Sequence, residues 1–262
     1  MAHDVDAVRR LFEYDASLPL DLRTVGCKRR DGAVVTEVRF AAARGGEVAA
    51  YVVEAGGALP GRPGVIYAHG GSGPGKHLFV GQAVELAHAG VSVVLADTSM
   101  PRPGEIEADE RALGDAVLVQ RRALDLLAAR GVTRFGYFGH SFGGTQGAVL
   151  SAVEPRLEAI VIAAMGTGFV EWLRREGITD EPYLARVARL DPVEFVAVPG
   201  RRELRFQHGR GDETIPLAAG RALFTAAAPP KRWAEYDCGH GVDGHPPALA
   251  DRIAFFREVL SA

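Results

Sequence analysis

Short apolar runs alternate with segments of helical periodicity from residue 65 to the end of the chain. The apolar runs cover 65–68, 91–96, 134–139, 157–164, 203–209 and 232–237, and the helical segments lie near 77–89, 108–130, 142–153, 216–227 and 246–260. The segment near 108–130 is the clearest helix, because its apolar positions recur at three- and four-residue spacing. Runs that are apolar on both faces, most of them followed by a helix, predict an α/β fold with a mostly parallel central sheet and helices on both faces.

The part of the chain before residue 65 follows a different pattern. Residues 4–14 predict a short helix with its apolar side chains facing inward. Runs 34–42 and 47–54 are rich in β-forming residues and meet at Arg44-Gly45-Gly46, which predicts an N-terminal β-hairpin. Because the sequence contains no internal repeat or low-complexity tract, we expect one domain over 1–262.

Composition and charge narrow the class of protein. Of the 262 residues, 47% are hydrophobic and 24% are charged, which is typical of a globular chain. A net charge of −3 argues against nucleic acid or an acidic membrane surface as a partner. Cys27 and Cys238 are too few for a disulfide scaffold and have no metal-binding spacing. The start of the chain has no apolar run typical of a signal peptide, and no stretch approaches the roughly 20 apolar residues of a membrane span, so we expect a cytoplasmic protein.

One segment carries a catalytic motif. The apolar run 134–139 leads directly into Gly139-His140-Ser141-Phe142-Gly143, which has the pattern G-x-S-x-G, and then into a helix of small residues. A serine hydroxyl is a weak nucleophile unless it is exposed beside a base, and a sharp strand-to-helix turn provides that exposure. The helix N-terminus also directs N–H groups at a developing oxyanion. The competing interpretation is a glycine-rich packing turn.

With this motif, the order of elements from Val34 to the C-terminus resembles the α/β-hydrolase family. In that family the catalytic acid follows a later strand than the serine, and the histidine follows the last strand. The segment 209–216, GRGDETIP, resembles the acid loop of the family, which implies Asp212 as the acid. Glu213 is the neighbouring alternative, and an ordinary Asp-Glu turn is the structural one.

Three histidines follow the serine as candidate bases. The resemblance implies His240, which lies between two glycines after the last apolar run, and His245 is the alternative. His208 precedes the acid and is expected to pack or to line a wall. His240, Asp243 and His245 are of metal-ligand type, but without a further firm partner we predict no metal site.

The segment 69–75, HGGSGPG, follows the first parallel strand and resembles the His-Gly loop of the family. The resemblance implies an oxyanion hole made by the backbone N–H groups of Gly71 and Phe142, with Ser72 as the second choice after Gly71. A nucleotide-binding loop is the other interpretation. It is disfavoured because a P-loop needs Ser or Thr where this chain has His77.

The segment 166–202 lies where many members of this family insert a cap. Its side chains Phe169 and Trp172, together with His69, are candidate walls of a substrate pocket, and two short helices packed on the core are the alternative. His69 is also expected to shape its own loop. Asp97 is expected to fix the loop that follows it.

The resemblance extends most closely to esterases related to dienelactone hydrolase. The dienelactone hydrolases themselves have a cysteine nucleophile, and Ser141 at that position favours ester hydrolysis over lactone hydrolysis. We therefore expect a serine esterase that acts on small-molecule esters of small to medium acyl size, without cofactor or metal. Peptide cleavage of the prolyl oligopeptidase type, a non-hydrolytic enzyme and a non-catalytic binding scaffold are the alternatives. The peptidases of that type carry a large additional domain, for which 262 residues leave no room.

Overall fold

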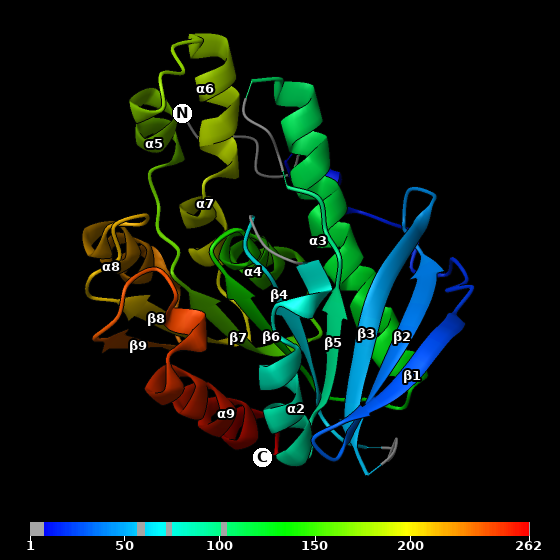
Figure 1. Ribbon diagram of the computed structural model, residues 1–262. Helices are drawn as coiled ribbons and strands as arrows, with labels where there is room; N and C mark the ends of the chain where they lie inside the picture. The colour runs from blue at the N-terminus through cyan, green and yellow to red at the C-terminus, as the bar shows by residue number, and fades with distance from the viewer. Residues whose placement is uncertain (1–7, 57–60, 72–74, 101–103, 262) are drawn as a thin grey trace.

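A nine-stranded sheet forms the centre of the protein. The computed structural model describes residues 8–56, 61–71, 75–100 and 104–261 (Figure 1). The strand order is β1-β2-β3-β5-β4-β6-β7-β8-β9. The bounds are β1 (Arg23–Arg30), β2 (Ala33–Ala41), β3 (Glu47–Ala55), β4 (Gly64–Ala68), β5 (Ser92–Ala96), β6 (Phe135–His140), β7 (Leu157–Ala163), β8 (Glu203–Gly209) and β9 (Lys231–Tyr236). Strands β4 to β9 are parallel to one another, whereas β1, β2 and β3 pair in antiparallel register.

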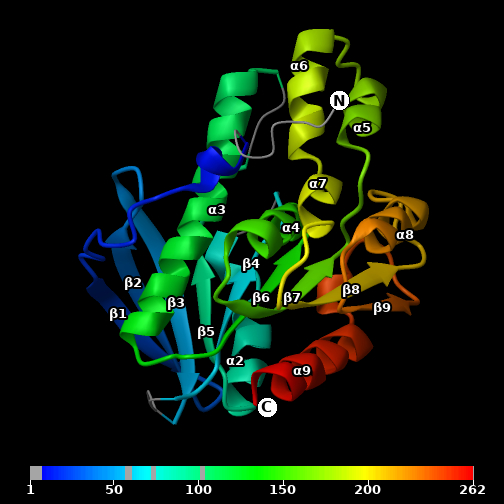
Figure 2. The same cartoon turned by 180° about the vertical axis from the view of Figure 1, so that it is seen from behind.

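Helices cover both faces of the sheet, as the alternation predicts (Figures 1 and 2). Helices α2 (Val80–His88) and α9 (Pro246–Leu260) lie on one face. Helices α3 (Ile106–Ala129), α4 (Phe142–Val153), α7 (Pro192–Val196) and α8 (Leu217–Ala226) lie on the other. The side chains of successive strand residues point to opposite faces of the sheet. Ile66 therefore packs on the face covered by α3 and α4, and Tyr67 on the face covered by α2 and α9.

The N-terminal region follows the prediction in part. Of the helix predicted over 4–14, residues 4–7 lie outside the described residues; residues 8 and 9 are helical and lead into a short 3-10 helix, η1 (Arg10–Phe12), and Val8 and Phe12 are buried. The predicted hairpin is present as β2 and β3, and a further strand, β1, extends it. Side chains of β1 are exposed on both faces, so no apolar alternation marks this strand in the sequence.

The segment 166–202 has two structural roles. Its first half contains α5 (Phe169–Arg175) and α6 (Glu181–Val187), whose apolar side chains form a separate small cluster around Leu173 and Leu184. Its second half contains η3 (Ala188–Leu190) and α7, and Phe195 of α7 packs in the main core. The first half therefore packs apart from the main core, and the second half packs on it. We call α5 and α6 the cap; they lie above the sheet in Figure 1.

The parallel strands end at one edge of the sheet. In open α/β sheets, ligands bind outside the carboxyl ends of the strands, because the loops that follow the strands meet there. The segments after β4, β6, β8 and β9 carry the residues that the motifs single out, and the cap lies over the same edge (Figure 1).

Candidate active site

Ser141 occupies a strained turn between β6 and α4. Its backbone has φ 53° and ψ −118°, a conformation that residues other than glycine rarely adopt. The turn is held because Ser141 N donates to Ala163 O at 2.9 Å and Gly144 N donates to Ser141 O at 2.7 Å. The side chain of Ser141 thereby lies at the start of α4 and lines a cavity.

The two glycines of the motif are required by close backbone contacts. A Cβ on Gly139 would lie 2.0 Å from Gly143 O, and a Cβ on Gly143 would lie 2.3 Å from Ala68 O. The buried Tyr137 hydroxyl donates to Gly143 O at 2.7 Å. The start of α4 therefore packs against β4 and β6 so closely that neither Gly139 nor Gly143 could carry a side chain.

Asp212 and His240 meet at the ends of β8 and β9. His240 Nδ1 lies 2.9 Å from Asp212 Oδ2 and 3.1 Å from Oδ1. Asp212 Oδ1 also accepts hydrogen bonds from the backbone N–H groups of Thr214, at 2.9 Å, and Ile215, at 2.8 Å. Burial acts to raise the pKa of Asp212, but the hydrogen bonds from His240 and Ile215 outweigh it and hold that pKa below its ordinary value. An ionised Asp212 keeps the proton of His240 on Nδ1 and leaves Nε2 free to accept one.

The alternative acid and bases have other positions, although His208 Nε2 lies 3.6 Å from Asp212 Oδ2. The side chain of Glu213 is exposed. His245 precedes α9 and packs against the ring of Tyr236. His208 is buried under the acid loop, where its Nε2 lies 2.9 Å from Ile215 O. Neither of these two histidines lines the cavity that contains Ser141.

His140 is a residue of the site that sequence reasoning missed. Its Nε2 lies 2.7 Å from the carbonyl oxygen of His240 and 3.2 Å from Asp243 Oδ1, so one ring nitrogen connects the turn at Ser141 to the loop that carries His240. Burial lowers the pKa of His140, although the Asp243 carboxylate opposes this effect. Its position inside the G-x-S-x-G motif was the available signal, but the motif leaves that position unspecified.

The serine and the histidine face the same space. Ser141 and His240 both line one cavity, and Asp212 lies behind His240 with its side chain fully buried. Among the residues that the structure describes, no hydrogen bond joins Ser141 Oγ to the ring of His240. Catalytic hydrogen bonds are commonly long in unliganded enzymes and tighten when substrate is bound.

Two backbone N–H groups border the cavity beside Ser141. Phe142 N is the first amide of α4 and has no partner within the helix. Gly71 lines the cavity, and the neighbouring Gly70 packs closely enough that a Cβ there would lie 3.3 Å from Ser141 Cβ. The alternative donor, Ser72, lies outside the described residues.

His69 meets one of its two expectations. It does not line the cavity, contrary to its expected place in a pocket wall, but its Nδ1 lies 2.7 Å from Gly70 O, so it shapes its own loop as predicted. Asp97 fixes the loop before α2, since its carboxylate accepts from Lys76 N at 2.7 Å and Lys76 Nζ at 2.8 Å. Residues 101–103 of the loop that follows Asp97 lie outside the described residues, so the expected role of Asp97 in that loop stays a prediction.

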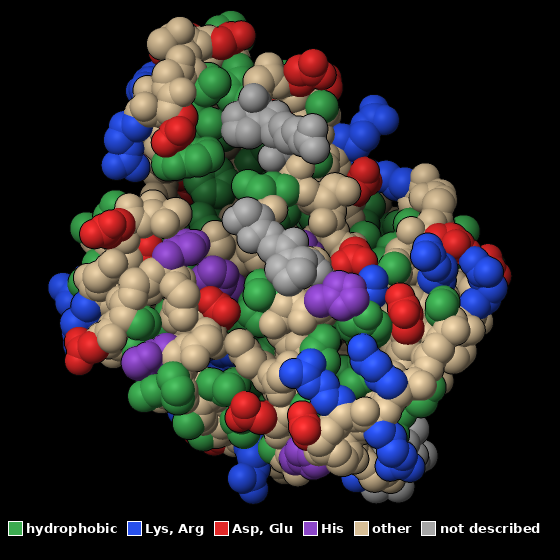
Figure 3. Space-filling model, viewed as in Figure 1, with side chains coloured by type: hydrophobic (Ala, Val, Ile, Leu, Met, Phe, Trp, Pro, Cys, Tyr) green, Lys and Arg blue, Asp and Glu red, His purple; other side chains and the backbone are tan. Residues whose placement is uncertain are grey.

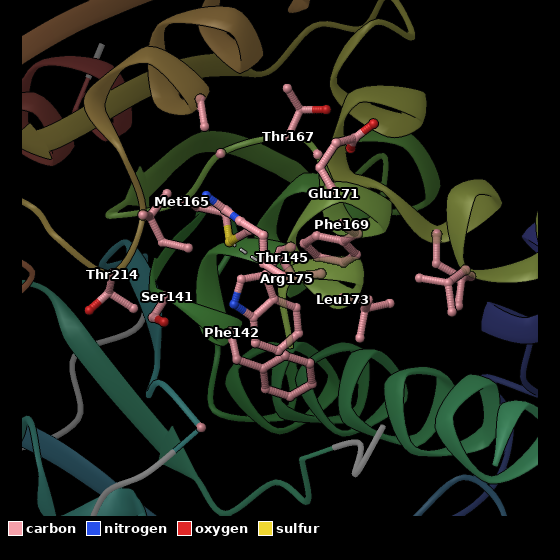
Figure 4. A pocket seen from close by; sticks show the side chains of 18 of the residues that line it. Ser141, Phe142, Thr145, Met165, Thr167, Phe169, Glu171, Leu173, Arg175 and Thr214 are labelled. Atoms are coloured by element: carbon pink, nitrogen blue, oxygen red, sulfur yellow. Dashed lines mark hydrogen bonds between the residues drawn. The ribbon is translucent and has the colours of Figure 1, made fainter. Parts of the chain in front are cut away.

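The cavity has a volume of about 990 Å³ and lies between the sheet edge and the cap. Most of its walls are apolar. Phe169 and Trp172 of α5 are among them, and the others include Met100, Leu113, Phe142, Met165, Leu173, Val187 and Ile215. Figure 4 shows Ser141 and Phe142 on one side of this space and the side chains of α5 on another, and Figure 3 shows hydrophobic side chains in the hollow below the cap.

Two other classes of site find no support in the described part of the chain. There, no group of three or more His, Cys, Asp and Glu side chains is arranged to hold a metal ion. None of the helices in the same residues has the length and apolar character to cross a membrane.

Comparisons with known proteins add to this geometry. No family model and no curated protein matches the sequence. Acetyl xylan esterase 1 from Thermoanaerobacterium sp. JW/SL YS485 superimposes with a TM-score of 0.78 at 16% identity, over 98% of this chain and 94% of its own. The fold is that of the α/β-hydrolases.

Further solved structures share this α/β-hydrolase fold. The acetyl xylan esterase from Paenibacillus sp. R4 has a TM-score of 0.73 at 19% identity and covers 95% of this chain and 92% of its own. Est1E from Butyrivibrio proteoclasticus with ferulic acid bound has a TM-score of 0.68 at 18% identity, over 82% of this chain and 96% of its own. The narrower resemblance to dienelactone hydrolase-related esterases stays a prediction.

Proposed function

We propose that this α/β-hydrolase is a serine esterase that cleaves carboxylic esters of small to medium acyl size. The observation that carries the proposal is the pair of Asp212 and His240, in which a buried carboxylate holds Nδ1 of an imidazole that lines the same cavity as Ser141. Esterase structures with the same fold, including two acetyl xylan esterases, support the choice of an ester as substrate.

The proposed reaction is a two-step acyl transfer. His240 Nε2 accepts the proton of the Ser141 hydroxyl while the serine oxygen attacks the ester carbonyl. The N–H groups of Gly71 and Phe142 stabilise the oxyanion of the tetrahedral intermediate. The alcohol leaves with a proton from His240, and water then hydrolyses the acyl-enzyme by the same two steps. Every catalytic group in this scheme belongs to the chain itself.

The serine is the direct test of this proposal. A fluorophosphonate probe is expected to label Ser141, because an activated serine attacks the phosphorus as it attacks a carbonyl carbon. Ser141→Ala is expected to lose labelling and to lower turnover of nitrophenyl butyrate on the order of 10⁶-fold. Mass spectrometry of the labelled peptide identifies the residue. Full turnover by the alanine variant, or faster cleavage of an aminoacyl anilide than of any ester by the wild type, would contradict the proposal.

A further inference from the structure

The arginines of the cap differ in their partners. Arg174 of α5 forms an ion pair with Glu181 at 3.1 Å, and Arg186 of α6 forms one with Glu110 of α3. Arg175 also lies on α5, next to Arg174, but within the described residues its side chain has no acidic partner within 4.0 Å and no hydrogen bond. Its side chain is one of those that line the cavity (Figure 4).

Among the described residues, none of the acidic side chains in the cavity lining pairs with Arg175, although Glu171 lies one turn before it on α5. The walls near α5 in this cavity are mainly apolar, with Phe169 and Leu173 on the same helix. The acids that share the lining are occupied in other ways. Asp109 is buried and accepts a hydrogen bond from the Tyr183 hydroxyl at 2.9 Å. Glu171 stands in the first turn of α5, where the helix dipole favours a negative charge.

An unpaired guanidinium beside apolar walls is suited to one class of ligand. It presents several N–H donors in a planar fork, which matches the two oxygens of a carboxylate. Charges of both signs line the cavity, since Asp109 and Glu171 are in the lining as well as Arg174 and Arg175. A non-specific attraction of anions is therefore not expected, and a preference would arise from direct contact with the fork.

We infer that Arg175 forms a carboxylate subsite, and that preferred substrates are esters that carry a free carboxylate at some distance from the ester group. This inference rests on the proposed esterase function and adds a substrate class to it. The cavity of about 990 Å³ contains both Ser141 and Arg175 in its lining, so one small molecule can reach both. Half-esters of dicarboxylic acids have this form, and so do acetyl esters of hydroxy acids.

Matched pairs of neutral and anionic esters test the subsite. One arm compares the monomethyl esters of glutarate, adipate, pimelate and suberate with the same esters in which a carboxamide replaces the free carboxylate. The other arm compares acetyl esters of ω-hydroxy acids with those of the matching ω-hydroxy amides. A carboxamide has nearly the shape of a carboxylate and no charge, so each ratio of kcat/KM isolates the ionic contact. The arm and the chain length with the highest ratio show on which side of the ester, and how far from it, the carboxylate binds.

We expect the wild type to prefer the carboxylate by about tenfold in one arm, which corresponds to about 1.4 kcal/mol. Arg175→Gln is expected to bring the ratio close to one, and Arg175→Lys to restore it in part, since an ammonium keeps the charge without the fork. Arg201→Gln removes the same charge from an exposed position outside the cavity and is expected to keep the wild-type ratio. The preference should also weaken at high salt, because Arg175 is exposed.

The outcomes separate the subsite from the esterase function. If the wild type cleaves the carboxamide esters but shows no preference for carboxylates in either arm, the subsite is wrong and the esterase proposal stands. A preference that persists in Arg175→Gln also overturns the subsite. Failure of the wild type to cleave any ester contradicts the proposed function itself.

Discussion

At the scale of single residues, the ionised state of Asp212 decides which nitrogen of His240 carries the proton. Asp212→Asn keeps the size of the side chain but can donate a hydrogen bond to Nδ1, which favours the tautomer with the proton on Nε2. We expect turnover to fall roughly 10⁴-fold with the fold retained. Steady-state kinetics and circular dichroism check the two parts. If Glu213→Gln causes the loss and Asp212→Asn does not, the neighbouring residue is the acid.

The same carboxylate links stability to pH. The pKa of Asp212 in the folded protein lies below its ordinary value of 3.8, so protonation favours the unfolded state. Its contribution to the free energy of unfolding is fully present above that ordinary value and is lost as pH falls through the folded pKa. Urea unfolding between pH 3 and pH 7 is therefore expected to show a flatter acid limb for Asp212→Asn than for the wild type. Parallel curves for the two proteins would contradict the lowered pKa.

His140 contributes through the position of another residue. Its Nε2 holds the backbone of His240, and it does not itself line the cavity. His140→Leu removes this contact and is expected to lower kcat by roughly 10- to 100-fold, because small misplacements of a catalytic group have effects of this size. KM should change little. His140→Gln places an amide nitrogen near the position of Nε2 and is expected to recover much of the rate. Equal losses in both variants, or a change confined to KM, would argue against this role.

At the scale of elements, Asp191 joins the entry and the exit of the cap segment. Its buried carboxylate accepts hydrogen bonds from the Thr167 hydroxyl at 2.6 Å and from the N–H groups of Gly168, at 2.7 Å, and Phe169, at 2.9 Å. It also caps α7 by accepting from Val193 N at 3.1 Å. One side chain thus fixes the start of α5, which carries part of the cavity wall.

We expect Asp191→Ala to lower the free energy of unfolding by about 1–3 kcal/mol, because buried N–H groups lose their acceptor. KM for esters should rise as well, since Phe169 loses its support. Asp180→Ala is the matched control, because Asp180 caps only α6 and is exposed; it should have a smaller effect on stability and none on KM. Thermal denaturation and ester kinetics measure both. Equal effects of the two substitutions would show that Asp191 acts only as a helix cap.

At the scale of the whole molecule, we expect the cap and the sheet edge together to limit substrate size. Each methylene of an acyl chain that is buried in a hydrophobic cavity makes binding more favourable by roughly 0.8 kcal/mol, until the cavity is full. We expect kcat/KM for nitrophenyl esters to rise from acetyl to about butyryl or hexanoyl and to fall for long acyl chains, whose ends stay in water. A spectrophotometric series over acyl length measures this. A steady rise through palmitoyl would indicate a tunnel instead of a bounded cavity.

The sequence predicted those parts of the protein that depend on local pattern. The parallel strands and their helices follow from apolar periodicity, and motif order led to Ser141, Asp212 and His240 at strand ends. Strand β1 was missed because its side chains are exposed and only backbone pairing with β2 defines it. The roles of His140 and Asp191 were missed for a related reason. The partner of His140 lies 100 residues away in the chain, and those of Asp191 at the start of α5 lie 22–24 residues away. Contacts of this kind leave no periodic trace in a sequence.

The order of the strands has a consequence for how activity appears during folding. The groups around the proposed reaction centre follow β4, β6, β8 and β9, so they are spread over most of the chain. Parallel strands pair only after the long segments between them have closed into loops, and such non-local pairing is slow. A chain emerging from the ribosome would contain Ser141 long before His240, and its serine would stay unreactive until the last strand joined the sheet. Reactivity toward a fluorophosphonate during refolding would thus mark completion of the whole sheet.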